Sequence, residues 1–168
     1  VHSTQAYYKD VEESLEDDEP SQYIRLDLND GIFGNTVFVG FPENGTEDFD
    51  YGTDATKLYS STEEVQFFAI ENDNDLCINA NAALSDQGKT IALHLVQTAN
   101  KENTLKISDL DQLPDTKITL EDLKTAIIQD FNEQPVYTFA SSLNDEAERF
   151  LLHFAYSPND IDEAALTE

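Results

Sequence analysis

The sequence contains no tryptophan, no methionine and a single cysteine, Cys77. One cysteine excludes an internal disulfide framework and a zinc site built from cysteines, so the fold depends on packing alone. No stretch approaches the ~18 consecutive apolar residues that a membrane-spanning helix requires, and the N-terminus lacks a signal-peptide pattern. We therefore expect no membrane insertion. The chain begins at Val1 instead of methionine, which predicts a fragment or a processed chain.

Basic residues are scarce, with nine Lys and Arg against 35 Asp and Glu and a formal net charge of −26. Binding to nucleic-acid phosphates needs clustered cations, so this composition excludes an electrostatic nucleic-acid binder and disfavours anionic membrane surfaces. Residues 23–156 carry 24 acidic and eight basic side chains, so the acidity is not confined to the ends. Such charge favours a monomer by self-repulsion and attracts divalent cations.

The chain of 168 residues and 18.9 kDa is long enough for one domain with a substantial core. Residues Asp10 to Glu19 contain seven carboxylates and no cation, a composition typical of a solvated linker. We expect an acidic N-terminal arm or linker over residues 1–22, one domain over residues 23–156 and an acidic C-terminal linker over residues 157–168.

Short runs rich in β-branched and aromatic residues alternate with clusters of Gly, Asn, Asp and Pro, which predicts many antiparallel strands. In residues 90–97 and 149–156 strongly apolar side chains occupy every second position, so each strand has one apolar face. This pattern favours an all-β fold, an antiparallel β-sandwich of jelly-roll type, with a barrel as the alternative. A helix around residues 63–68 would be too short to compete. The nine predicted strands are residues 23–28, 36–41, 65–70, 76–80, 90–97, 104–108, 117–122, 136–141 and 149–156.

Two acidic loops are candidate calcium sites. Residues 43–54 (ENGTEDFDYGTD) contain five carboxylates and no cation, and residues 71–75 (ENDND) lie in a turn between two predicted strands. Calcium takes six to eight oxygen ligands, which such loops can supply, although neither loop matches the EF-hand pattern. Because Asp and Asn also favour turns, a purely structural role is the alternative. The candidate ligands of Ca²⁺, the candidate cofactor, are Glu47, Asp48, Asp50, Asp54, Asp73 and Asp75.

Catalytic motifs are not evident. His94 and His153 lie on predicted strands without a second histidine nearby, so we interpret them as half-buried structural residues. The sequence has no G-x-S-x-G pattern, and nothing around Cys77 would activate its thiol. We therefore expect no enzymatic activity. Tyr51 and Tyr59 lie in polar stretches and are candidates for stacking on sugar rings, with loop anchoring as the alternative.

Three segments together resemble a known bacterial module. They are F-D-Y-G-T-D-A-T-K-L-Y from Phe49 to Tyr59, K-I-T-L-E-D-L-K-T from Lys117 to Thr125, and E-R-F-L-L-H-F from Glu148 to Phe154. Their order and spacing resemble the β-sandwich module that precedes the C-terminal sorting domain in large surface proteins exported by the type IX secretion system. The resemblance covers about residues 23–156. That family usually has glycine after L-K-T, where this chain has Ala126.

The resemblance implies a noncatalytic, extracellular binding or spacer module of a secreted, cell-surface adhesin of a diderm bacterium. Such a module would be monomeric within a longer chain and would recognise a glycan or a surface protein. The alternative is a carbohydrate-binding module of a secreted glycan-degrading enzyme. In the segment from Phe49 to Tyr59, which recurs in that family, Lys57 is expected to pair with Asp50 or Asp54 and attach the loop to the sheet. The alternative role for these residues is contact with a ligand.

Overall fold

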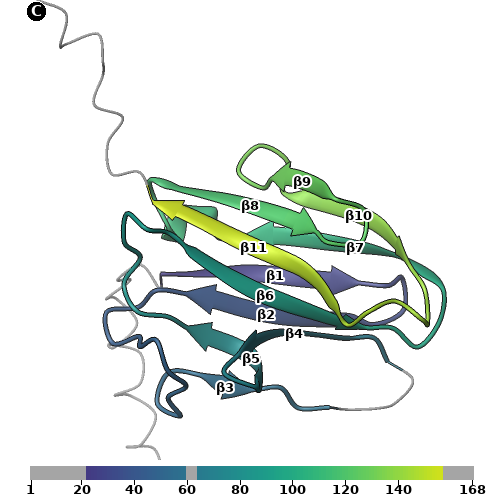
Figure 1. Ribbon diagram of the computed structural model, residues 1–168, viewed down its shortest axis with the longest axis horizontal. Helices are drawn as coiled ribbons and strands as arrows, with labels where there is room; N and C mark the ends of the chain where they lie inside the picture. The colour runs from purple at the N-terminus through teal and green to yellow at the C-terminus, as the bar shows by residue number, and fades with distance from the viewer. Residues whose placement is uncertain (1–21, 60–63, 157–168) are drawn as a thin grey trace, which may run out of the picture.

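The computed structural model describes residues 22–59 and 64–156, and within these ranges the regular structure is β-strand apart from one short 3₁₀ helix (Figure 1). The all-β prediction is therefore confirmed. Of the predicted acidic flanks, residues 1–21 and 157–168 lie outside the described residues. The elements are β1 (Tyr23–Asn29), β2 (Gly34–Gly40), β3 (Ala55–Thr56), β4 (Gln66–Glu71), β5 (Asn74–Ala80), β6 (Lys89–Val96), β7 (Lys101–Ser108), η1 (Leu110–Gln112), β8 (Thr116–Asp122), β9 (Ile127–Asp130), β10 (Val136–Ser141) and β11 (Glu148–Tyr156).

Each of the nine predicted strands corresponds to an observed one, with ends that differ by a few residues. The two additional strands, β3 and β9, have two and four residues. Residues 66–68, which lie in a segment too short for a competing helix, belong to strand β4. The β-branched and aromatic runs therefore identify the long strands of this fold correctly.

The strands form one mixed sheet in the order β10-β7-β1-β2-β5-β4-β6-β11-β8-β9, and β3 pairs with β5 off this path. Among the described strands one pair is parallel, β2 with β5, where Phe38 lies opposite Ile78. The other pairs are antiparallel, as the sequence predicts. The parallel pair requires a long crossover, because β3 and β4 separate β2 from β5 along the chain.

The sheet curls until its two end strands come close, so the molecule is nearly closed into a barrel-like shape (Figure 1). Strands β9 and β10 are linked by a side chain at this closure. Gln129 Nε2 of β9 donates to the carbonyl oxygen of Val136 in β10 at 2.9 Å and to that of Gln134 at 2.7 Å. A side chain thus satisfies part of the edge that a neighbouring strand would otherwise cover.

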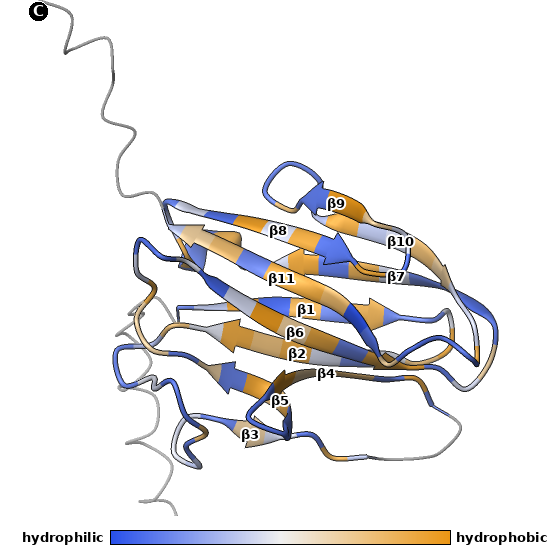
Figure 2. Ribbon diagram, viewed as in Figure 1, coloured by the Kyte–Doolittle hydropathy of each residue, from blue (hydrophilic) through white to orange (hydrophobic). Residues whose placement is uncertain are grey.

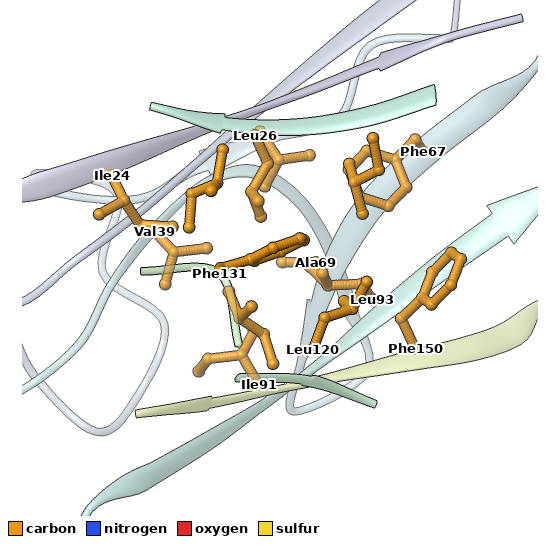
Figure 3. Close-up of a cluster of buried hydrophobic side chains, with 14 of the residues drawn as sticks. Ile24, Leu26, Val39, Phe67, Ala69, Ile91, Leu93, Leu120, Phe131 and Phe150 are labelled. Atoms are coloured by element: carbon orange, nitrogen blue, oxygen red, sulfur yellow. The ribbon is translucent and has the colours of Figure 1, made fainter. Parts of the chain in front are cut away.

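The core lies between the facing halves of the curled sheet. Alternate residues of β1 (Ile24, Leu26 and Leu28) are at most 1% exposed, as a strand with one buried face requires. The alternation of apolar and polar residues along the strands is visible in Figure 2. Phe131, which follows β9, is completely buried and lies in the middle of the cluster in Figure 3. The short strand β9 therefore leads directly into a central core residue.

The turn between β8 and β9 has a left-handed residue at Ala126, with φ 59°. The Ala126 N–H donates to the carbonyl oxygen of Asp122 at 2.8 Å and closes the turn. Glycine adopts this conformation without steric cost, whereas alanine costs about 1–2 kcal/mol there. The turn therefore has a conformation that favours glycine, although alanine occupies the position.

Candidate functional site

The acidic loop of residues 43–54 joins β2 to β3 and folds on its own backbone. The Asp50 carbonyl oxygen accepts the N–H groups of Thr53 at 3.0 Å and Asp54 at 2.7 Å, and Asp50 Oδ1 accepts the N–H of Gly52 at 2.8 Å. These contacts form a compact turn in which Asp50 acts through both its backbone and its side chain. Such local bonds are what Asp offers in turns.

Asp54 fixes this loop to the sheet. Its buried carboxylate accepts the Asp50 N–H at 2.8 Å through one oxygen and the Ala80 N–H at 2.7 Å through the other. Ala80 is the last residue of strand β5, so the Asp54 side chain bonds to both the loop and the sheet. Both oxygens of Asp54 are thus occupied by backbone donors in the structure.

The remaining predicted ligands of the first loop lie on its exposed side. Glu47 pairs with Lys89 of β6 at 2.7 Å. Asp48 Oδ1 accepts from Asn72 Nδ2 at 3.4 Å, so this loop touches the turn between β4 and β5. The two acidic loops therefore do meet, through an amide and not through carboxylates facing one another.

The second acidic loop is the tight turn of the β4–β5 hairpin. Asn72 and Asp73 have positive φ values of 47° and 64°, the conformation that a two-residue hairpin turn requires and that Asn and Asp tolerate. Asp75 accepts a hydrogen bond from the Tyr59 hydroxyl. The turn geometry thus accounts for the residue types at 72 and 73 and favours the structural alternative there.

Glu71, at the end of β4, connects the two loops with Lys89. Its carboxylate accepts from Asn79 Nδ2 at 2.7 Å and lies 3.7 Å from Lys89 Nζ. Burial raises the pKa of Glu71 above its ordinary value, and the Lys89 charge and the Asn79 bond oppose this only in part. Glu47 and Glu71 therefore share Lys89, and the negative charges of Asp54 and Glu47 add to the raised pKa of Glu71.

Within residues 22–59 and 64–156, no group of three or more His, Cys, Asp or Glu side chains is arranged to hold a metal ion. Among these residues, Asn81 Oδ1 is a buried oxygen that has no hydrogen-bond partner, and Asn81 lies against Gly45 of the first loop. Calcium binding by Glu47, Asp48, Asp50, Asp54, Asp73 and Asp75 stays a prediction.

The two tyrosines predicted to bind a ligand differ in their surroundings. Tyr51 is 89% exposed and packs edge-on against Phe49, with ring centroids 4.7 Å apart. Tyr59 packs edge-on against Phe68 at 6.0 Å. Burial and the hydrogen bond to Asp75 raise the pKa of the Tyr59 hydroxyl to about 12. Tyr51 is thus a presented aromatic ring, whereas Tyr59 is tied to the β4–β5 turn.

A shallow groove reaches the first acidic loop at Thr53. It has a volume of about 390 Å³ and is lined by Tyr23, Phe38, Thr53 and Ile78. The Tyr23 ring lies over Gly40, where an added Cβ would come within 2.5 Å of the ring. The glycine thereby allows the ring to lie flat on the outer face of the sheet. The groove was not predicted from the sequence, although a glycine on the strand next to an aromatic residue was a possible signal.

The histidines have structural contacts. His153 Nε2 lies 2.7 Å from Glu121 Oε2, and its Nδ1 lies 2.8 Å from Thr90 Oγ1. The His94 ring packs against Phe68 with ring centroids 5.7 Å apart. Both are partly buried, in agreement with the interpretation made from the sequence.

Lys57 has a different partner from the one expected. Its Nζ donates to Asn35 Oδ1 at the start of β2, and not to Asp50 or Asp54. Its backbone N–H donates to the Asp75 carbonyl oxygen at 2.7 Å. Burial lowers the pKa of the Lys57 ammonium, while the charges of Cys77 and Glu64 oppose the shift. Lys57 does attach its loop to the sheet, but through an amide.

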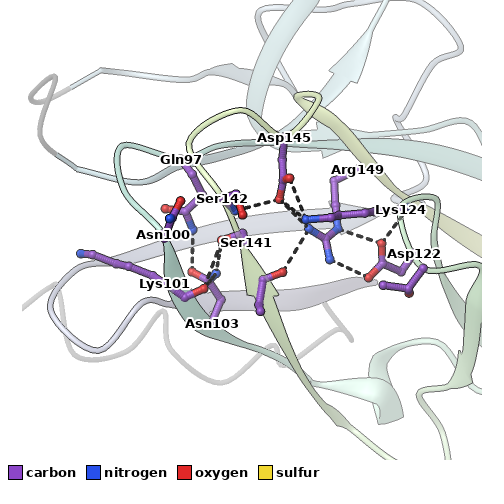
Figure 4. A network of polar contacts seen from close by, with 12 residues as sticks. Gln97, Asn100, Lys101, Asn103, Asp122, Lys124, Ser141, Ser142, Asp145 and Arg149 are labelled. Atoms are coloured by element: carbon purple, nitrogen blue, oxygen red, sulfur yellow. Dashed lines mark hydrogen bonds and ion pairs between the residues drawn. The ribbon is translucent and has the colours of Figure 1, made fainter.

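A buried polar network lies at the closure of the sheet (Figure 4). Arg149 of β11 is 2% exposed and forms two parallel bonds of 2.8 Å to Asp122 at the end of β8. The guanidinium also donates to Asp145 at 3.2 Å and to the Ala140 carbonyl oxygen of β10 at 3.3 Å. Tyr137 of β10 donates to Asp122 at 2.8 Å. This Arg149–Asp122 pair joins strands on both sides of the closure.

A smaller buried network continues from it. Asn103 of β7 donates to Ser141 Oγ at 2.6 Å and accepts from Gln97 Nε2 at 2.8 Å. Both networks are built from polar residues that sequence analysis did not single out. They connect the loops after β6 and β10 at one end of the molecule. Within the second network, Gln97 Oε1 is buried without a hydrogen-bond partner among the described residues.

Among residues 22–59 and 64–156, no helix has the length and hydrophobicity that a membrane span requires.

The fold and these contacts define an all-β module. Its buried polar residues attach the loops to the sheet and link the strands where the sheet nearly closes. Within this class, the chain belongs to the family described as "Domain of unknown function (DUF8693)", which matches residues 1–154. No curated protein and no solved structure matches the chain significantly.

Proposed function

We propose that the chain is a noncatalytic module of an exported, adhesin-type surface protein, carried to the cell surface of a diderm bacterium by a type IX-like route. One observation carries the proposal. Asp122 and Arg149 come from two of the three segments on which the resemblance rests, and they meet in the buried pair at the closure. Two residues that carry the resemblance therefore stabilise the fold. This supports a similarity of the whole module over a chance similarity of short segments.

The first and last described residues of the domain lie where a module displayed on a surface would need them. Gln22, before β1, and Tyr156, at the end of β11, line the same cavity of about 430 Å³, so the ends lie close together. In Figure 1 β1 begins and β11 ends on the same side of the molecule. If the module is joined to a longer chain on this side, its opposite side faces outward. That opposite side contains the loops after β1, β6 and β10. There Lys101 pairs with Asp30 at 2.8 Å, and Asn100 accepts from the Leu143 N–H at 3.2 Å.

Surface exposure is tested with an antiserum raised against residues 22–156. We expect it to label intact cells of the source bacterium, and external protease to remove the label while a cytoplasmic control protein survives. Inactivation of the type IX translocon should abolish the label. Labelling that appears only after lysis contradicts the proposal, and surface labelling that persists without the translocon contradicts the export route.

A carbohydrate-binding module is the second candidate, and it is favoured by the exposed ring of Tyr51 in the loop whose Thr53 lines the 390 Å³ groove. Stacking on a sugar needs a presented aromatic plane with neighbouring polar groups. Thr53 belongs to the same loop as Tyr51 and lines the groove, so a bound sugar could contact both.

If this candidate is right, Tyr51→Ala should weaken glycan binding by roughly three- to tenfold, because an aromatic contact contributes about 0.5–1.5 kcal/mol. The melting temperature should not change, since the side chain is 89% exposed. Glycan arrays followed by titration calorimetry with calcium present measure both effects. Leu58→Ala, at 85% exposure, is the matched control without an aromatic ring. Equal affinities of wild type and Tyr51→Ala would exclude Tyr51 as the platform.

A further inference from the structure

The side chains of Lys57 and Asn35 form an arrangement that can react. The two residues lie 22 positions apart, and Lys57 Nζ is in direct contact with the Asn35 carboxamide. The amide is held in one orientation. Its Nδ2 donates to the Val65 carbonyl oxygen at 2.8 Å, and its Oδ1 accepts the Phe67 N–H at 3.3 Å. Val65 and Phe67 are completely buried, so the groups that orient the amide are themselves fixed.

We propose that Lys57 and Asn35 form an intramolecular amide cross-link between Nζ and Cγ, with release of ammonia. The site has the three requirements of such a transfer: a nucleophilic amine in contact with the carboxamide, a donor to the carbonyl oxygen, and a carboxyl group nearby. Fixed contact between the reacting groups replaces the encounter that makes the same reaction negligible in solution.

Each element of the reaction has a residue in place. The neutral Lys57 amine turns from its hydrogen bond with Oδ1, so that its lone pair attacks Asn35 Cγ, and the Phe67 N–H stabilises the negative charge that develops on Oδ1. The Cγ–Nδ2 bond then breaks, and its electron pair leaves with the nitrogen. One proton from Nζ passes through the Glu64 carboxyl group to this nitrogen, which departs as ammonia. One C–N bond forms and one breaks, so the step needs no oxidant or other co-reactant.

Two electrostatic observations fit this chemistry. Burial lowers the pKa of Lys57, which increases the fraction of neutral amine. The charge of Glu64 acts on Lys57 and opposes the lowering of its pKa, which makes the Glu64 carboxyl group the candidate for the proton transfer. The cross-link would attach the segment after β3 covalently to the start of β2.

The mass of the purified 168-residue chain after incubation at neutral pH tests the proposal. We expect the wild type to be lighter than its sequence mass by one ammonia. A protease digest should contain a branched peptide that joins the Asn35 and Lys57 segments. A folded wild type with its full sequence mass would overturn the proposal and leave a hydrogen bond only.

Variants separate the cross-link from other losses of ammonia. Asn44 precedes Gly45 and can lose ammonia as a succinimide, so Lys57→Arg is the decisive control and should have its full mass. A deficit that persists in Lys57→Arg overturns the proposal. Asn35→Asp should lose one water in place of ammonia, which detects the same bond even if Lys57→Arg folds poorly. Glu64→Gln retains both partners and should have its full mass; wild-type extent of cross-linking in this variant would overturn the role of Glu64.

Discussion

Arg149→Met should lower the free energy of unfolding by about 3–5 kcal/mol at neutral pH, because it leaves the completely buried Asp122 carboxylate without its cation. Methionine retains most of the side-chain volume, so the loss reports charge and hydrogen bonds more than packing. The guanidinium also lies 4.8 Å from the Phe139 ring centroid, a favourable cation–π contact that disappears with it. Denaturant unfolding followed by fluorescence or circular dichroism measures the effect.

Lys124→Met is the matched control. Lys124 pairs with Asp145 at 2.7 Å, as close as the Arg149 contacts, but the lysine side chain is 43% exposed. Exposed ion pairs contribute about 0–1 kcal/mol, so this variant should be almost as stable as the wild type. Equal losses in the two variants would contradict the assignment of the stability to the buried pair.

The destabilisation by Arg149→Met should also depend on pH. Burial tends to raise the pKa of Asp122, but the bonds from Arg149 and Tyr137 outweigh it and hold the pKa below its ordinary value. The stability from this group is therefore present above about pH 4, the unfolded pKa, and is lost as the pH falls through the lower folded value. Without Arg149, burial should raise the pKa, so protonation relieves the variant at acid pH. The difference between wild type and variant should shrink from pH 7 to pH 4, and a constant difference would point to packing.

The sequence pattern predicts that Asp122 is buried but does not predict this for Arg149, and both outcomes have local causes. In β8 the inward residues are Thr116, Ile118 and Leu120, and Asp122 continues the same alternation, so the period of two places it inside. The same rule places Arg149 outside, on the side of Leu151 and His153. A β-bulge between Glu148 and Phe150 shifts the register, and both Arg149 and Phe150 are buried as a result.

The overlooked strands have equally local causes. Strand β3 has only two residues, and β9 has exposed Ile127 and Ile128 next to each other, so neither shows an alternating pattern. The parallel pairing of β2 with β5 is a long-range choice that no pattern within either strand encodes. By contrast, all nine long strands were predictable, because their apolar residues alternate or form short runs between turn residues.

The sequence identified several residues of the candidate site but not the partners that they contact. The sequence indicated that Asp54 and Lys57 matter, since both lie in the recurrent segment, but it could not assign their partners. Asn35 and Ala80 lie 22 and 26 positions away along the chain, and their proximity depends on the strand order. Asn35 itself carries no signal in a sequence rich in polar loop residues.

Asp54→Ala should lower the free energy of unfolding by about 2–4 kcal/mol, because it leaves the N–H groups of Asp50 and Ala80 without their charged acceptor. If the acids of this loop are turn formers, the loss should be the same in millimolar calcium and in chelator. Asp48→Ala is the control: its side chain is exposed and has one contact at 3.4 Å, so it should cost less than about 0.5 kcal/mol in chelator.

The same pair of variants distinguishes the two roles considered for the acidic loop. Calcium bound at a hundred times its dissociation constant would add about 2.7 kcal/mol to the wild type. Asp48→Ala would then lose this increment while remaining as stable as the wild type in chelator. If calcium and chelator instead give the wild type the same unfolding curve at constant ionic strength, the acids of this loop are turn formers. In that case Asp54, the one buried carboxylate among the predicted ligands, accounts for the loop's contribution to stability.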